Sequence, residues 1–102
     1  MYMVIRKYTK VRSVTDAARR AKRGVGEILR QSQGFRSYHV LDAGKGVGIA
    51  VMIFDNRESA NVANAKILGF VQASLHDLDL GVPEIISGEL LVDIESHGFS
   101  VK

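Results

Sequence analysis

The sequence predicts an α+β domain with the ferredoxin-like βαββαβ topology, and three observations lead to that fold class. Four segments have the residue pattern of strands, at residues 2–8, 35–42, 47–54 and 88–95. One stretch of helical periodicity separates the first strand from the second, and another separates the third from the fourth. Only a short turn, residues 43–46, joins the second and third strands, which therefore form a hairpin. This order gives a four-stranded antiparallel sheet with both helices on one face.

The chain has the length of one domain and the composition of a folded globular protein. Its 102 residues are 46% hydrophobic and 25% charged, and we treat residues 1–102 as a single domain. The absence of cysteine excludes disulfides, thiolate metal ligands and a cysteine nucleophile, and it suits a reducing cytoplasm. No apolar run approaches the roughly 20 residues of a membrane span, and the opening residues lack a leader's cleavage pattern. We therefore expect a soluble, cytoplasmic protein with no membrane association.

The first strand and the first helix follow from two periodicities. Residues 2–8 alternate between two faces, as a strand does. Ser13 or Thr15 is placed to cap the helix that follows, and Gln33 and Gly34 end it. The apolar positions of this helix form one stripe, made of Val14, Ala17, Ala18, Ala21, Val25, Ile28 and Leu29. Its opposite arc is cationic and faces water, with Arg19, Arg20, Lys22, Arg23 and Arg30.

The second helix and the last strand are bounded by capping and breaking residues. Asp55 and Glu58 have the spacing of a capping box, which opens the helix. One face of this helix carries Ala60, Ala63, Ile67, Phe70, Val71, Ser74 and Leu78. Pro83, the only proline, breaks the chain before the strand at residues 88–95. In that strand one face is apolar, with Leu90, Val92 and Ile94.

The third strand is apolar on both faces, and this has a consequence for assembly. One face carries Ala50, Met52 and Phe54, and the other carries Val47, Ile49, Val51 and Ile53. Two helices can cover only one side of the sheet, so the second apolar face needs another cover. A contiguous apolar patch marks an interface or a ligand site. The simplest cover is the same face of a second copy, so we expect a homodimer through the open sheet face.

Nearly the whole chain resembles the antibiotic-biosynthesis-monooxygenase type of dimeric α/β-barrel protein. The segments that carry the resemblance are VIRKY, GFRSYHVLDAGKGVGIAVMIFD, ESANVANAKILGFVQASLHDL and PEIISGELLV. Similar proteins pair two sheets into a barrel that holds a small, often aromatic or polyketide-like molecule. Some members oxidise it with dioxygen and without a metal or organic cofactor, and others have no known activity. The resemblance therefore implies a homodimer that binds a small apolar or aromatic ligand and needs no cofactor.

The resemblance also points to two residues of the second helix. Asn64 and Phe70 lie where such helices often carry Asn and Trp, which makes both candidates for substrate contact. Haem-degrading relatives rely on an Asn, Trp and His set, and this chain has no Trp, which argues against that activity. Judged from the residues alone, Asn64 flanks the apolar face of its helix, either as a cavity hydrogen-bonding group or as a boundary residue.

The polar or ionisable candidates for the expected interior include Arg6, Tyr38 and His39. Arg6 lies mid-strand among apolar neighbours, where it either holds an anionic or phenolate oxygen or extends to solvent. Tyr38 and His39 are adjacent and face opposite sides of their strand, so only one of them can face the cavity. They are the catalytic candidates. His39 suits a general base for an acidic C–H or O–H group, and its alternative is a hydrogen-bonded structural role.

Met52 and Phe54 complete the candidate substrate-binding set. Both are interpreted as packing of the core or of the dimer, and toward a ligand they would contribute shape. The three histidines, His39, His76 and His97, share no metal-ligand spacing, and there are no thiolates, so we expect no metal site.

Two other functions fit parts of the sequence. A non-catalytic binding or interaction protein of the same fold explains it equally well, because no residue set demands catalysis. An RNA-recognition-motif domain shares the topology, KGVGIAVM resembles its third strand, and the chain is basic, with net charge +3. RNA binding by that motif needs aromatic side chains, however, and Val47, Ile49 and Met52 occupy those positions. We therefore place a cofactor-independent monooxygenase first, with catalysis itself undecided, and a nucleic-acid partner last.

Overall fold

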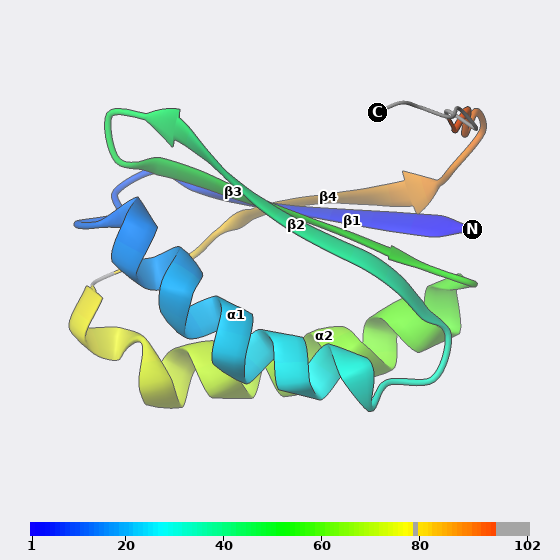
Figure 1. Cartoon of the computed structure of the whole chain (residues 1–102), viewed down its shortest axis with the longest axis horizontal. Coiled ribbons are helices and arrows are strands. Elements are labelled where there is room, and N and C mark those ends of the chain that lie inside the picture. Colours follow the sequence, from blue (N-terminus) through cyan, green and yellow to red (C-terminus); the bar gives the residue numbers. More distant parts are fainter. Residues whose placement is uncertain (79, 96–102) are drawn as a thin grey trace, which may run out of the picture.

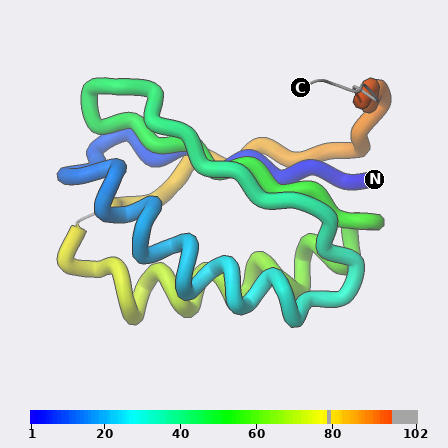
Figure 2. Tube along the Cα trace, in the orientation of Figure 1, coloured from blue at the N-terminus to red at the C-terminus, as the bar shows by residue number. Residues whose placement is uncertain are grey.

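The predicted topology is confirmed by the computed structural model, which describes residues 1–78 and 80–95. The elements are β1 (Tyr2–Tyr8), α1 (Val14–Arg30), β2 (Phe35–Gly44), β3 (Val47–Phe54), α2 (Arg57–Ser74), the short 3-10 helix η1 (His76–Leu78) and β4 (Glu84–Glu89). The four strands form one antiparallel sheet in the order β2-β3-β1-β4. Both helices lie side by side on one face of this sheet, as predicted (Figures 1 and 2). Within the described residues, neither helix is both long and apolar enough to cross a bilayer.

Strand register decides which residues share a face of the sheet. Met52 of β3 lies opposite Val4 of β1 and Tyr38 of β2, and all three point toward the helices. The core forms there, between the sheet and the two helices. Val4, Leu29, Met52, Phe54 and Ile67 are fully buried in it, and burial of each such side chain stabilises the fold by about 1.5–3 kcal/mol.

The opposite face of the sheet has no cover within the chain. Ile5, Val51 and Ile86 lie in one row across β1, β3 and β4 on this face, and Ile86 is 57% exposed. The other members of the open face are Met3, Lys7, Ser37, His39, Leu41, Val47, Ile49, Ile53, Glu84 and Gly88. Met52 and Phe54 are therefore core residues of the single chain. Of the two roles left open for them, packing against a second copy is excluded by their position under the helices.

Short polar side chains begin both helices. The N-cap of α1 is Ser13, whose Oγ accepts a hydrogen bond from the backbone N–H of Asp16 at 3.2 Å. The N-cap of α2 is Asn56, whose Oδ1 accepts from the N–H of Ser59 at 2.8 Å. The prediction that Asp55 opens α2 was wrong by one residue. Asp55 instead forms an ion pair with Arg36 of the neighbouring β2 segment.

The last strand was predicted too far along the chain. β4 is Glu84–Glu89 and not residues 88–95, since pairing depends on β1, which begins at Tyr2 opposite Glu89. One further backbone hydrogen bond, from Leu90 N–H to the Met1 carbonyl at 2.9 Å, ends the contact. Beyond it no described strand pairs with the chain, and apolar residues of this segment are left exposed: Leu91 by 91%, Val92 by 72% and Ile94 by 88%.

Candidate ligand-binding cavity

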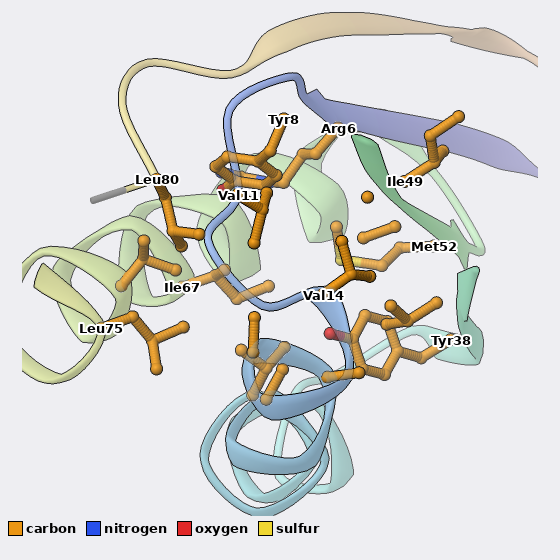
Figure 3. A pocket seen from close by; sticks show the side chains of 18 residues that line it. Arg6, Tyr8, Val11, Val14, Tyr38, Ile49, Met52, Ile67, Leu75 and Leu80 are labelled. Carbon is orange, nitrogen blue, oxygen red and sulfur yellow. The ribbon is translucent and has the colours of Figure 1, made fainter. Parts of the chain in front are cut away.

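An apolar cavity of about 60 Å³ lies between the sheet and the helices (Figure 3). Its walls come from α1, from β3 and from the C-terminal half of α2. The apolar side chains that line it include Val14, Ala18, Ala21, Val25, Ala50, Met52, Ile67, Val71 and Leu75. Arg6, Tyr8 and Tyr38 are also among the described residues that line it, although the surface that faces the cavity is apolar. The cavity is therefore a hydrophobic chamber with polar side chains in its walls, and most small-molecule sites are likewise mainly apolar.

Arg6 is the most unusual residue of the cavity. β1 places it on the helix-facing side, where its side chain is only 4% exposed. Its Nη2 donates to Asn64 Oδ1 at 3.1 Å and to the Asn64 backbone carbonyl at 3.5 Å. Its Nε and Nη1 have no hydrogen-bond partner among the described residues. Of the two roles left open for Arg6, extension to solvent is excluded by this burial.

The charge of Arg6 is also unmatched. No Asp or Glu is among the described residues that line the cavity. Removing a charged group from water costs several kcal/mol unless it is paired and hydrogen-bonded. Two donors of this buried cation are therefore without an acceptor among the described residues, and an oxygen that carries negative charge would satisfy them.

Tyr38 supplies a second polar group. It reaches from β2 toward α1 with its hydroxyl directed inward (Figure 3). Burial raises the pKa of Tyr38 to about 12, the neighbouring Tyr8 adds to the rise, and the charge of Arg6 opposes it. Tyr38 is therefore protonated at neutral pH and is able to donate a hydrogen bond. Between the two adjacent candidates of this strand, the structure brings Tyr38 to the cavity.

His39 lies on the other side of the sheet. It pairs with Val51 on the open face and is exposed. A general base in the cavity cannot be His39 in this arrangement, because a strand residue points away from the side occupied by its neighbour.

Three of the remaining candidates, Asn64, Phe54 and Phe70, are not among the residues that line the cavity. Asn64 holds the guanidinium of Arg6 in place through its side chain and backbone. Phe54 packs edge-on against Phe35, with ring centroids 6.2 Å apart, inside the core. Phe70 covers Gly24, where an added Cβ would lie 2.0 Å from its ring, and so packs α2 against α1. Met52, by contrast, lines the cavity.

Among the described residues that line the cavity, Tyr8 is the polar one that was not predicted from the sequence. It follows Arg6 by two positions on the same strand, so it shares the face of Arg6. The alternation of β1 carried that signal, since a correct assignment of Arg6 to the interior also places Tyr8 there.

Potential metal ligands do not gather in the part of the chain that the structure describes. No three His, Asp or Glu side chains within residues 1–78 and 80–95 come together in a metal-binding arrangement. His76 is exposed in η1, and His97 lies outside the described residues.

Comparison with solved structures identifies the fold. The chain is similar to a monooxygenase from the gene ActVA-Orf6 of Streptomyces coelicolor in complex with nanaomycin D, at 16% identity over 93% of this chain and 91% of that one, with a TM-score of 0.72. It is similar to SnoaB, a cofactor-independent oxygenase from Streptomyces nogalater, at 12% identity over 93% and 97%, with a TM-score of 0.70. A further match is to an antibiotic biosynthesis monooxygenase, at 14% identity over 90% and 100%, with a TM-score of 0.68.

These likenesses span nearly the full length of the chain and confirm the resemblance at the level of the fold. The domain has the fold of the antibiotic biosynthesis monooxygenase structures. No protein-family model and no curated protein sequence matches the chain. At identities this low the structural likeness shows the fold alone, so the function has to be argued from the chemistry of the cavity.

Proposed function

We propose that this protein binds a small, mostly apolar molecule in the cavity, and that it oxidises this molecule with dioxygen as a cofactor-independent monooxygenase. The observation that carries the proposal is the buried Arg6, whose Nε and Nη1 have no partner within the described chain. An aromatic or polyketide-like substrate with an ionisable hydroxyl supplies the missing anionic oxygen. Its carbon skeleton suits the apolar walls.

Arg6 and Tyr38 have distinct roles in the proposed reaction. Arg6 stabilises the enolate or phenolate form of the substrate, which lowers the substrate's pKa inside the cavity. The electron-rich carbon of that anion forms a bond to dioxygen, and the substrate supplies the electrons. Protonation gives a hydroperoxide, and loss of water leaves one oxygen atom in a ketone or quinone product. Tyr38, which is protonated at neutral pH, is positioned to donate to an oxygen of the bound molecule.

The comparisons support this proposal by analogy. One similar structure is a monooxygenase in complex with nanaomycin D, and another is a cofactor-independent oxygenase. The analogy does not extend to the haem-degrading set, since this chain has no Trp.

A non-catalytic binding protein of the same fold is the second candidate, and one observation favours it. The described residues that line the cavity include no carboxylate and no imidazole. A substrate would therefore have to lose its proton to solvent, or arrive already ionised, before reacting. A binding protein has no such requirement.

We further propose a cytoplasmic homodimer formed through the open sheet face. The apolar row of Ile5, Val51 and Ile86 needs a cover, and the same row on a second copy provides one. The described open face carries no Phe, Tyr or Trp, so the base stacking that an RNA-recognition motif needs has no platform there.

The test is oxygen uptake with polycyclic phenols as substrates, with product mass measured in parallel. Wild-type protein is expected to consume one dioxygen per substrate and to add one oxygen atom to the product without added metal or cofactor. Arg6→Met is expected to abolish both. Binding of the same phenols by wild-type protein with no oxygen uptake would decide for the binding protein, and no binding at all would overturn both candidates.

A further inference from the structure

Tyr38 separates the cavity from a second hollow on the surface. That hollow lies between α1 and β2, has a volume of about 450 Å³ and is open to solvent. Ala18, Tyr38 and Val40 line both spaces, so these side chains form the partition between them. Ala18 contributes a single methyl group and Val40 is already 38% exposed. Tyr38 has the largest side chain of the three.

The cavity is too small for an aromatic molecule as it stands. Its volume is about 60 Å³, whereas an apolar cavity of about 150 Å³ holds one benzene ring. Binding of a ligand therefore requires a lining side chain to move. Tyr38 lies on an edge strand, close to a register shift between Phe35 and Ser37, where the backbone is less constrained than in a central strand. Rotation of the Tyr38 ring outward would join the cavity to the surface hollow.

The α1 side of the surface hollow carries two cationic residues, and a glycine without a side chain lies between them. Lys22, Gly26 and Arg30 line it from α1, and their spacing of four residues places them on one stripe of the helix. No acidic residue is among its described lining residues, although Arg30 lies 3.5 Å from Glu27. A Cβ added at Gly26 would have no heavy atom within 4 Å. Gly26 thus leaves this part of the hollow empty, although glycine inside a helix costs about 1 kcal/mol relative to alanine.

We propose that this hollow is the mouth of the cavity, that Tyr38 is its gating residue, and that the ligands are apolar molecules with a single negative charge. Lys22 and Arg30 attract the anion to the mouth, and Arg6 holds its charged oxygen inside. A single charge is expected because Arg6 is the only cation among the described residues that line the cavity. The proposal rests on the proposed function, because it assumes that the cavity binds a small molecule.

A matched pair of fluorescent probes tests the ligand class and the route together. 8-Anilinonaphthalene-1-sulfonate is apolar with one negative charge, and N-phenyl-1-naphthylamine is its neutral counterpart. Stopped-flow fluorescence gives the association rate of each with the full-length protein. Wild-type protein is expected to bind the sulfonate more tightly, and Arg6→Met is expected to remove that preference.

Two glycines provide a matched test of the mouth. Gly26→Leu fills the mouth and is expected to slow association of both probes by about tenfold or more. Gly69→Leu adds the same side chain to α2 at a position that is equally open, and it is expected to leave the rates unchanged. Tyr38→Ala removes the gating ring and is expected to speed association. Circular dichroism shows whether each variant keeps its fold.

The two cationic residues of the hollow are tested by removing their charge. The double variant Lys22→Gln, Arg30→Gln is expected to slow association of the sulfonate about threefold at low ionic strength, and this difference disappears at high salt. Association of the neutral probe is expected to stay unchanged. Equal slowing of both probes would contradict attraction by charge.

The outcomes separate this inference from the function on which it rests. If Arg6→Met loses sulfonate binding while Gly26→Leu and Tyr38→Ala associate at the wild-type rate, the ligand uses another route. The mouth is then overturned and the proposed function stands. If wild-type protein binds neither probe, or if Arg6→Met binds the sulfonate unchanged, the cavity is no anion site, and both proposals are overturned.

Discussion

Arg6 is the cavity residue whose side chain both lowers the stability of the protein and provides the proposed binding group. A guanidinium that is only 4% exposed, with two unpartnered nitrogens, is retained against a desolvation penalty of several kcal/mol. An apolar residue at this position would pack better, since the walls around it are aliphatic. Asn64 satisfies one nitrogen and fixes the orientation of the other two. The arrangement is that of a binding group held ready for a ligand at the expense of stability.

Replacement of Arg6 by an apolar residue should therefore stabilise the protein. Arg6→Met is expected to raise the free energy of unfolding by about 1–3 kcal/mol, because it removes an uncompensated buried charge and keeps most of the side-chain volume. Urea unfolding of the ligand-free protein measures this change. Arg6→Lys keeps the charge and serves as the control, with no gain expected. A loss of stability in Arg6→Met would mean that water or a bound anion already satisfies the guanidinium in solution.

At the scale of elements, periodicity predicted most of the structure because burial imposes it. The alternation of β1 and the apolar stripe of α1 show which face meets the core. Both elements, and β3 with its two apolar faces, lie where the sequence predicted them. The two wrong boundaries, the start of α2 and the position of β4, depend on contacts with other segments, which a local sequence pattern does not show. Asn56 displaces Asp55 as the cap of α2 by a single residue. β4 ends at Glu89, which pairs with Tyr2 at the start of β1.

The same limit applies to the candidate site. Arg6, Tyr38 and Met52 line the cavity because a strand points alternate residues to one face, so a few correct registers place them there. Phe54 and Phe70 have the right faces but pack against Phe35 and Gly24, and a sequence pattern does not distinguish a core position from a cavity wall. The mouth between α1 and β2 depends on how two distant elements approach each other, and no local spacing encodes that distance.

Helix capping at α2 is testable at a single position. Asn56→Ala is expected to lower the free energy of unfolding by about 1 kcal/mol, because the N–H of Ser59 loses the Oδ1 acceptor that lies at 2.8 Å. Asn56→Asp keeps an acceptor and is expected to retain wild-type stability. Thermal or urea unfolding followed by circular dichroism measures both. A larger loss from Asp55→Ala than from Asn56→Ala would show that Asp55 is the cap in solution.

At the scale of the whole molecule, one side of the sheet carries two apolar surfaces that no described part of the chain covers. One is the open face with its row of Ile5, Val51 and Ile86. The other is the segment after β4, in which Leu91 and Ile94 are almost fully exposed. The chain ends its described part on the side of the sheet opposite the helices (Figure 1). Exposed apolar area of this extent is uncommon on a monomer, and one symmetric pairing of two copies would cover the open face of each.

The dimer proposal is tested by two variants of nearly equal exposure. Ile86, on the open face, is 57% exposed, and Val62, on α2, is 55% exposed, so an aspartate at either position costs the isolated chain little. Ile86→Asp is expected to weaken the dimer by about a hundredfold or more, because each charge would be buried at the interface, whereas Val62→Asp is expected to leave it intact. Light scattering over a range of concentrations should give wild-type protein and Val62→Asp a mass near twice 11.2 kDa, and Ile86→Asp the mass of one chain. A dimer that survives Ile86→Asp would move the interface away from the open face, and a wild-type monomer would leave that face free for a different partner.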